Sequence, residues 1–271
     1  MRIGSNFLTT EKDISSALEK KQFQVFFQPK VDPSKHEIVG MEALLRWQHP
    51  ERGLLYPEDF IAAIEASKMM VSVGNWVLQN VCAEVVRWQQ QGLPHMRVAV
   101  NLSARQFNQP HFIDTIDRIL EETGLSPQWL EFEITESALM ENVLQTVMLL
   151  TDLKVRDIRI SIDDFGTGYS SLSYLKNFPI HRIKIAQEFV RDIPENTDDA
   201  AIVETIITMA RHLGLGVIAE GVEKRAQVDF LSQRGCLEMQ GFHFARPLLP
   251  DEISTRLGQS GSSGAFCLYE P

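Results

Sequence analysis

Short apolar segments of strand type alternate with amphipathic segments of helix type along most of the chain, and this alternation most restricts its possible folds. Helix-like segments separate nearly all of the strand-like ones. Strands that alternate with helices over short connections form a parallel α/β sheet, because each helix returns the chain to the same sheet edge. The eight expected strands cover residues 23–29, 37–46, 97–103, 129–136, 158–163, 182–185, 216–220 and 237–244.

Eight such units in one domain predict a (β/α)8 barrel, the TIM-like architecture. The turn Asp32-Pro33-Ser34-Lys35 joins the first two strands as a hairpin, so the first strand should be antiparallel. That strand is expected to end at Pro29, which cannot donate a backbone hydrogen bond. An open, doubly wound sheet is the alternative fold.

Three parts of the chain are expected to differ in organisation. Residues 1–22 carry Ile14, Ala17 and Leu18 at helical spacing and predict a lead-in helix with a linker. Residues 23–257 form the barrel. Residues 258–271 begin with glycines and serines and predict a flexible tail.

The charge balance restricts the class of ligand. With 26 basic and 36 acidic residues, the formal net charge is −10. Such a chain repels polyanions, so it is not expected to bind a nucleic acid polymer, and a phosphate ligand should arrive with divalent cations.

Cysteine usage and hydropathy bear on location. Cys82, Cys236 and Cys267 show no Cys-x-x-Cys spacing, which argues against a zinc knuckle or a disulfide framework. No signal peptide and no apolar run of about 18 residues is found. These features favour the cytoplasm, although a longer protein containing this chain could be tethered to a membrane.

The strand from Ile158 ends on two adjacent acids, Asp163 and Asp164, followed by Gly166-Thr167-Gly168. Alone, an acid pair after a strand is usually a solvated turn, and two glycines are weak evidence for phosphate binding. The pattern becomes specific because other strands also end on polar residues.

In a barrel of this type the carboxyl ends of the strands form the reactive face. Five acids crowded there would repel one another unless cations neutralised them. Carboxylate and amide ligands without His or Cys favour Mg²⁺ or Mn²⁺, and the number of acids leaves room for two ions. Two ions of this kind indicate phosphodiester hydrolysis. The residues that close the strands are Glu42, Asn101, Glu133, Asp163, Asp164, Lys184, Glu220 and Gln240.

Several ordered motifs resemble those of the EAL-domain phosphodiesterases, which hydrolyse cyclic di-GMP to linear pGpG. The resemblance extends from Phe23 to Leu248. The motifs are Gln28-Pro29, Glu42-Ala43-Leu44 with Arg46-Trp47, Asn101-Leu102-Ser103, Glu133-Ile134-Thr135-Glu136, Asp163-Asp164-Phe165-Gly166-Thr167-Gly168-Tyr169-Ser170-Ser171, Lys184-Ile185, Glu220-Gly221-Val222-Glu223 and Gln240-Gly241-Phe242.

The resemblance implies roles for individual residues. The first metal would be held by Glu42, Asn101, Glu133 and Asp163. The second would be held by Asp163, Asp164 and Glu220. Catalytic roles would fall on Glu42, Lys184 and Glu220, with either Lys184 or Glu220 acting on the attacking water. Substrate contacts would come from Gln28, Leu44, Arg46 and Gln240. Loop support would come from Glu136, which would anchor residues 165–171, and from Glu223.

One departure from the family pattern bears on activity. The family usually reads Lys-Ile-Asp where this chain reads Lys184-Ile185-Ala186, so a carboxylate beside the lysine is missing. The main expectation is an active cyclic di-GMP phosphodiesterase. The alternatives are a catalytically weakened EAL domain that senses cyclic di-GMP and a general metallophosphatase. The resemblance also implies a homodimer and a sensor or diguanylate cyclase domain upstream.

Overall fold

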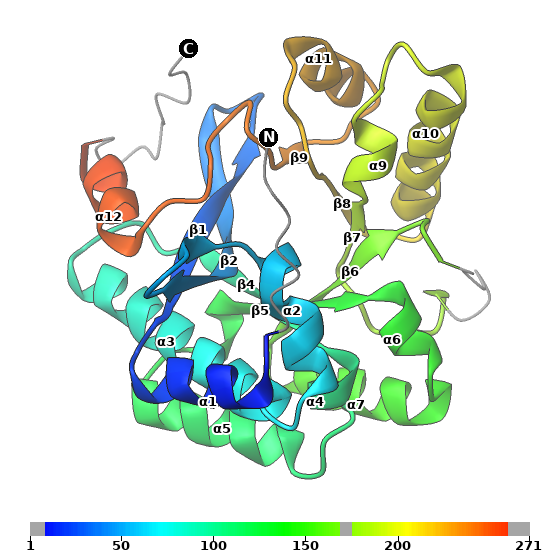
Figure 1. Ribbon diagram of the computed structural model, residues 1–271. Helices are drawn as coiled ribbons and strands as arrows, with labels where there is room; N and C mark the ends of the chain where they lie inside the picture. The colour runs from blue at the N-terminus through cyan, green and yellow to red at the C-terminus, as the bar shows by residue number, and fades with distance from the viewer. Residues whose placement is uncertain (1–8, 169–174, 260–271) are drawn as a thin grey trace.

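The strands form a closed barrel in the computed structural model, which describes residues 9–168 and 175–259 (Figure 1). The sheet order is β1-β9-β8-β7-β6-β5-β4-β2-β3, and pairing of β1 with β2 closes the ring and leaves β3 outside it. The strands are β1 Phe23–Asp32, β2 Glu37–His49, β3 Gly53–Leu55, β4 Arg97–Leu102, β5 Leu130–Thr135, β6 Arg159–Phe165, β7 Arg182–Ile185, β8 Gly216–Ala219 and β9 Glu238–Met239.

Strand directions confirm the barrel with an antiparallel first strand. β1 runs antiparallel to both neighbours, β2 and β9, whereas the other ladders of the ring, in the order β2-β4-β5-β6-β7-β8-β9, are parallel. The alternative fold, an open doubly wound sheet, is excluded because β1 and β2 at the two ends of the barrel sheet pair with each other.

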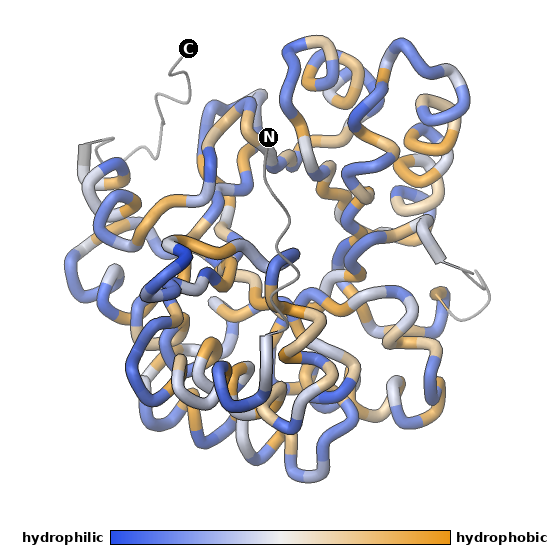
Figure 2. Tube along the Cα trace, in the orientation of Figure 1, coloured by the Kyte–Doolittle hydropathy of each residue, from blue (hydrophilic) through white to orange (hydrophobic). Residues whose placement is uncertain are grey.

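Helices pack around the outside of the barrel (Figure 1). Apolar residues concentrate on the strands and on the helix faces toward them, while polar residues lie on the loops and outer faces (Figure 2). In the described part of the chain, no helix has the length and apolar character needed to cross a membrane. The helices are α1 Glu11–Glu19, α2 Pro57–Ala66, α3 Met70–Gln90, α4 Ala104–Phe107, α5 Phe112–Thr123, α6 Glu136–Met140, α7 Val143–Val155, α9 Gln187–Val190, α10 Thr197–His212, α11 Arg225–Gln233 and α12 Pro250–Gln259, with the 3₁₀ turn η1 at Pro127–Trp129.

The predicted lead-in helix is present as α1. Thr10 caps it by accepting a hydrogen bond from the backbone of Asp13, whose carboxylate accepts one from the backbone of Thr10. Ile14 and Ala17 are fully buried. The helix is therefore packed against the rest of the molecule by its apolar face.

Pro29 does not end the first strand, contrary to the prediction. β1 continues to Asp32, with Pro29 opposite Met41. Phe27, two residues earlier, directs its backbone groups away from β2 and exchanges hydrogen bonds with Leu248. Because backbone direction alternates along a strand, Pro29 also faces away from β2, and its missing donor leaves that ladder intact.

The predicted last strand is also shorter than expected. β9 contains only Glu238 and Met239, and Gln240 continues the contact by donating its backbone N–H to Ala219. Residues 241–245 then turn back over Val222. Tyr169, Ser170 and Ser171 of the glycine loop, and the tail from residue 260, lie outside the described residues.

Candidate metal and catalytic site

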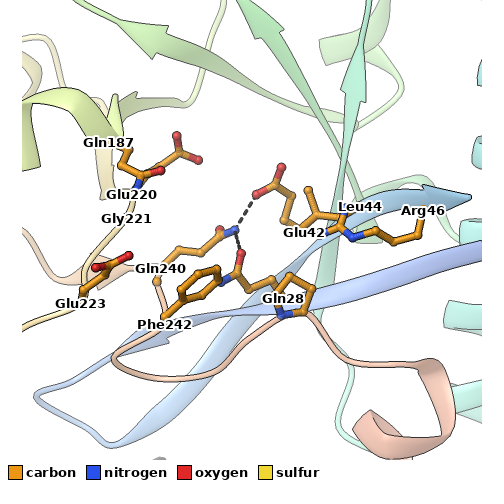
Figure 3. A pocket seen from close by; sticks show the side chains of 12 residues that line it. Gln28, Glu42, Leu44, Arg46, Gln187, Glu220, Gly221, Glu223, Gln240 and Phe242 are labelled. Atoms are coloured by element: carbon orange, nitrogen blue, oxygen red, sulfur yellow. Dashed lines mark hydrogen bonds between the residues drawn. The ribbon is translucent and has the colours of Figure 1, made fainter. Parts of the chain in front are cut away.

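The carboxyl ends of the barrel strands bring the predicted polar residues together. Glu42 of β2 accepts hydrogen bonds from Asn101 Nδ2 at 2.7 Å and from Gln240 Nε2 at 2.5 Å. Gln240 also donates to Gln28 Oε1 at 3.0 Å (Figure 3). These contacts join Gln28 and Glu42, which lie within β1 and β2, to Asn101 near the end of β4 and to Gln240 directly after β9.

Lys184 lies among the acids that we call the rim, namely Glu42, Glu133, Asp163, Asp164 and Glu220. Its Nζ lies 2.5 Å from Glu133, 2.6 Å from Glu220, 3.0 Å from Asp163 and 3.8 Å from Glu42. The residue is 1 % exposed. Burial alone would lower its pKa, but the surrounding carboxylates raise the pKa of Lys184 well above its ordinary value.

The carboxylates respond differently to this setting. Burial opposes ionisation of Glu133, yet the charges of Lys184 and Lys30 outweigh it and lower the pKa of Glu133 to about 2. For Glu220, burial dominates and Lys184 offsets only part of it, so its pKa is raised to about 8. Burial likewise raises the pKa of Glu42. Burial thus opposes ionisation of Glu42 and Glu220 even though both lie beside the Lys184 ammonium group.

A subset of these acids could hold a divalent ion. Oxygen atoms of Asp163, Asp164 and Glu220 lie within 4.8 Å of one another. Asp164 adopts a left-handed backbone with φ of 50°, which is uncommon outside glycine. Its pKa is raised by burial and by Asp163. Oxygen donors of this kind fit Mg²⁺ or Mn²⁺.

The start of the glycine loop rests on Glu136. This residue is 4 % exposed, and its Oε2 accepts a hydrogen bond from the backbone of Gly166 at 3.3 Å. A side chain at Gly168 would lie 3.5 Å from the same carboxylate. Glu136 therefore contacts the beginning of the segment that the family resemblance implies it anchors.

Two cavities border the rim on either side of β2. The smaller, of about 210 Å³, is lined by Gln28, Glu42, Leu44, Arg46, Glu220, Glu223, Gln240 and Phe242, among others (Figure 3). The larger, of about 710 Å³, combines apolar side chains of α2 and α3 with Asn101, Glu133, Asp163 and Asp164.

Arg46 and Glu223 hold positions at the edge of the smaller cavity. The Arg46 guanidinium lies 5.1 Å from the ring centroid of Tyr56 and donates to the Leu45 carbonyl at 2.8 Å. The Glu223 backbone donates to Gln227 Oε1 at 2.7 Å. Neither contact involves the rim acids, so both side chains remain at the cavity wall.

Ala186, the position where the family usually has aspartate, directly follows β7. It is 2 % exposed and occupies the N-cap position of α9, where no side-chain hydrogen bond caps the helix. A carboxylate at this position would therefore be two residues from Lys184 along the chain and at the N-terminus of α9.

Sequence reasoning missed the charged residues below the rim. Lys30, Glu131 and Arg182 each lie two positions from a recognised site residue, namely Gln28, Glu133 and Lys184. All three are buried inside the barrel. Residues two apart on a strand point to the same face, so the spacing of these charges from the site residues could have indicated that they lie inside the barrel.

Comparison with known proteins places these features in context. A family model described as "EAL domain" matches residues 11–247. The chain is 40 % identical over 241 residues to the bifunctional diguanylate cyclase/cyclic di-GMP phosphodiesterase MucR of Pseudomonas aeruginosa, covering 89 % of this chain and 35 % of MucR. It is 40 % identical over 242 residues to the cyclic di-GMP phosphodiesterase PdeR of Escherichia coli, covering 89 % and 36 %. The chain thus spans about a third of the length of these relatives.

Solved structures show the same similarity. The PaMucR phosphodiesterase in complex with c-di-GMP superimposes with a TM-score of 0.87 at 40 % identity, covering 89 % of this chain and 98 % of that one. Klebsiella pneumoniae BlrP1 in a manganese/c-di-GMP complex gives a TM-score of 0.75 at 31 % identity, covering 84 % and 57 %.

Proposed function

Because the chain belongs to the EAL-domain family, we propose that it is a metal-dependent phosphodiesterase that hydrolyses cyclic di-GMP to linear pGpG. The observation that supports this most is the cluster of buried Lys184, Glu42 and Glu133 with half-buried Asp163 and Glu220. MucR and PdeR, whose names include this activity, are each 40 % identical to the chain.

The proposed cofactors are two Mg²⁺ or Mn²⁺ ions. Glu42, Asn101, Glu133 and Asp163 would hold one, and Asp163, Asp164 and Glu220 the other. The absence of His and Cys from this set and the surplus of negative charge support the choice of hard cations. Such ions, when bound, supply Lewis-acid activation of water and of the phosphoester.

The chain's own residues would orient the reactants. Lys184, with Nζ among three carboxylates, would hold the attacking water or stabilise charge on the phosphate, and Glu220 is the alternative group for acting on the water. Leu44 lines both cavities, and acids of the site line each of them, so a dinucleotide could place one phosphodiester at the acids while its nucleosides extend to both sides. Gln28, Leu44, Arg46 and Gln240 would contact it, while Glu136 and Glu223 support the loops.

Chromatography of the products tests this proposal. The purified chain is incubated with cyclic di-GMP and either Mg²⁺ or Mn²⁺, and in parallel with a generic phosphodiester such as bis(p-nitrophenyl) phosphate. Appearance of pGpG, with little cleavage of the generic ester, supports the proposal. Binding without product would favour the sensor, and equal cleavage of both compounds would favour the general metallophosphatase.

Replacing Ala186 tests whether the missing carboxylate limits turnover. Ala186→Asp is expected to raise kcat about tenfold, the usual size of effects from residues next to metal ligands, because it adds negative charge beside Lys184. Ala186→Asn is the matched control, since it can cap α9 without adding charge. Equal rates for both variants, or no change in either, would contradict a role for the carboxylate.

Assembly and domain context complete the proposal. We expect a homodimer and, because MucR and PdeR are about three times as long, a sensor or diguanylate cyclase domain upstream. Light scattering of the purified chain tests the dimer, and the sequence of the full gene product tests the upstream domain.

A further inference from the structure

The interior of this barrel is charged where TIM barrels normally carry layers of branched apolar side chains. Below the rim, Lys184 contacts Glu133, Glu133 contacts Lys30, and Lys30 lies 4.0 Å from Glu131. These four residues are each 1 % exposed. Arg182 continues the alternation of sign by pairing with Glu131 and Glu238 at 3.1 and 2.8 Å.

Lys30 and Lys184 hold Glu133 from two sides. Lys30 Nζ donates to Oε1 at 2.6 Å, while Lys184 Nζ donates to Oε2 at 2.5 Å. Lys30 belongs to β1 and lies two residues beyond Gln28, so it approaches from one layer deeper in the barrel. Glu133 therefore has one oxygen fixed from the interior and the other directed toward the rim.

The fold leaves room for the Lys30 side chain. Lys30 is opposite Gly40 of β2, and a β-carbon at Gly40 would lie 3.8 Å from Lys30 Cδ. The same β-carbon would lie only 3.2 Å from the Arg97 carbonyl. The stem of Lys30 therefore passes over a glycine on its way to Glu133.

We propose that Lys30 is a positioning residue of the site, whose ammonium group fixes the Glu133 carboxylate so that it can serve the proposed metal centre. The inference rests on the proposed function, because Glu133 is there a metal ligand. Lys30 itself is too deep to touch substrate, and it acts only through Glu133. Loss of such a supporting contact typically weakens metal binding about 10- to 100-fold.

Isothermal titration calorimetry of the metal-free chain with Mn²⁺ measures the Kd for the ion and tests the proposal without substrate. Lys30→Met is expected to raise the Kd for Mn²⁺ about tenfold or more. Arg182→Met is the matched control, because it removes an interior cation that contacts Glu131 and Glu238 but not Glu133. Its Kd for Mn²⁺ should stay within about twofold of the unmodified chain, although both variants lose a buried cation.

Each outcome is decisive. A Kd of Lys30→Met within threefold of that of the unmodified chain would overturn the proposal. An increase in the Kd of Arg182→Met as large as that of Lys30→Met would also overturn it, because Lys30 would then have only a structural role. If Lys30→Met does not fold, Lys30→Gln replaces it, because its shorter and neutral side chain removes the ammonium group but stays polar. A Kd equal to that of the unmodified chain would then overturn the proposal. Failure of the unmodified chain to bind Mn²⁺ would instead count against the proposed function.

Discussion

Glu42 accepts hydrogen bonds from two amide side chains of the site, one at each carboxylate oxygen. Its two oxygens accept hydrogen bonds from different strands, one from Asn101 and one from Gln240. Both partners are amide N–H donors, so the position requires an acceptor at each oxygen. The side chain therefore needs two acceptor oxygens, which a glutamine side chain cannot supply.

Glu42→Gln is expected to reduce hydrolysis of cyclic di-GMP by about 100-fold or more while the fold is retained. The new amide presents an N–H group to a neighbouring donor and removes a predicted metal ligand. Rates of pGpG formation and circular dichroism measure the two effects. Glu121→Gln, the same change at an exposed site on α5, should leave the rate unchanged. A fully active Glu42→Gln variant would exclude the proposed role.

At the scale of elements, sequence periodicity predicted the barrel and its rim but not its short helices or its interior. Residues that end strands were recognisable because apolar positions alternate before them. The helices α6 and α9 contain only 5 and 4 residues, too few to show a helical period. Lys30, Glu131 and Arg182 were missed because a charge within a strand usually marks a face in water, whereas here opposite charges from three strands pair inside the closed sheet.

The turn between β1 and β2 depends on Asp32. Its Oδ1 accepts hydrogen bonds from the Ser34 backbone at 3.0 Å and hydroxyl at 2.6 Å. Burial opposes ionisation, but these bonds and Lys35 outweigh it and lower the pKa of Asp32 below its ordinary value of 3.8. A carboxylate whose pKa is lower in the folded state than in the unfolded state stabilises the fold at pH values above its unfolded pKa. This stabilisation is lost as the pH falls through the folded pKa.

Asp32→Ala is therefore expected to lower the free energy of unfolding by about 1 kcal/mol at pH 7, the usual contribution of such hydrogen bonds. Below pH 4 the difference from the unmodified chain should shrink, as urea denaturation at several pH values would show. Asp32→Asn keeps an acceptor but loses the charge, so its difference from the unmodified chain at pH 7 should be smaller than that of Asp32→Ala and should shrink over the same pH range. A constant difference for Asp32→Ala down to pH 2 would count against the assignment.

The chain after β9 passes very close to the segment after β8. A β-carbon at Gly241 would lie 2.1 Å from the Val222 carbonyl oxygen and 2.3 Å from its nitrogen. Val222 also exchanges backbone hydrogen bonds with Gln240 and His243. Only glycine fits here, and this contact sets the position of Gln240 at the rim.

Gly241→Ala is expected to lower the free energy of unfolding by about 3 kcal/mol, because backbone rather than a flexible side chain must move. Thermal and urea denaturation measure the loss. Gly258→Ala in α12, where no atom lies within 4 Å of the added carbon, should be neutral or slightly stabilising. Equal stabilities of the two variants would show that the segment adapts at little cost.

At the scale of the whole molecule, the acidic site and the stability of the barrel are separable. The apolar core lies between the strands and the surrounding helices, and includes Phe27, Phe132, Ile160 and Ile183 at 1 % exposure or less. The acids of the rim lie at one end of the sheet and are already paired in part with Lys184 and, below it, Lys30. We therefore expect these two ammonium groups to hold the acids together without metal ions.

Removal of divalent ions with a chelator is expected to abolish hydrolysis without unfolding the chain. The far-ultraviolet circular dichroism should be unchanged, because backbone hydrogen bonds hold the helices and the barrel ladder and the side chains of the rim take no part in them. The free energy of unfolding should fall only by the binding contribution, about 2.7 kcal/mol for an ion present at 100 times its Kd, and the Tm should fall accordingly. Re-addition of Mn²⁺ should restore both activity and Tm, whereas Ca²⁺ serves as a comparison ion of larger radius. Unfolding upon chelation would mean that repulsion among the rim acids exceeds what Lys184 and Lys30 offset, and that the ions are structural as well as catalytic.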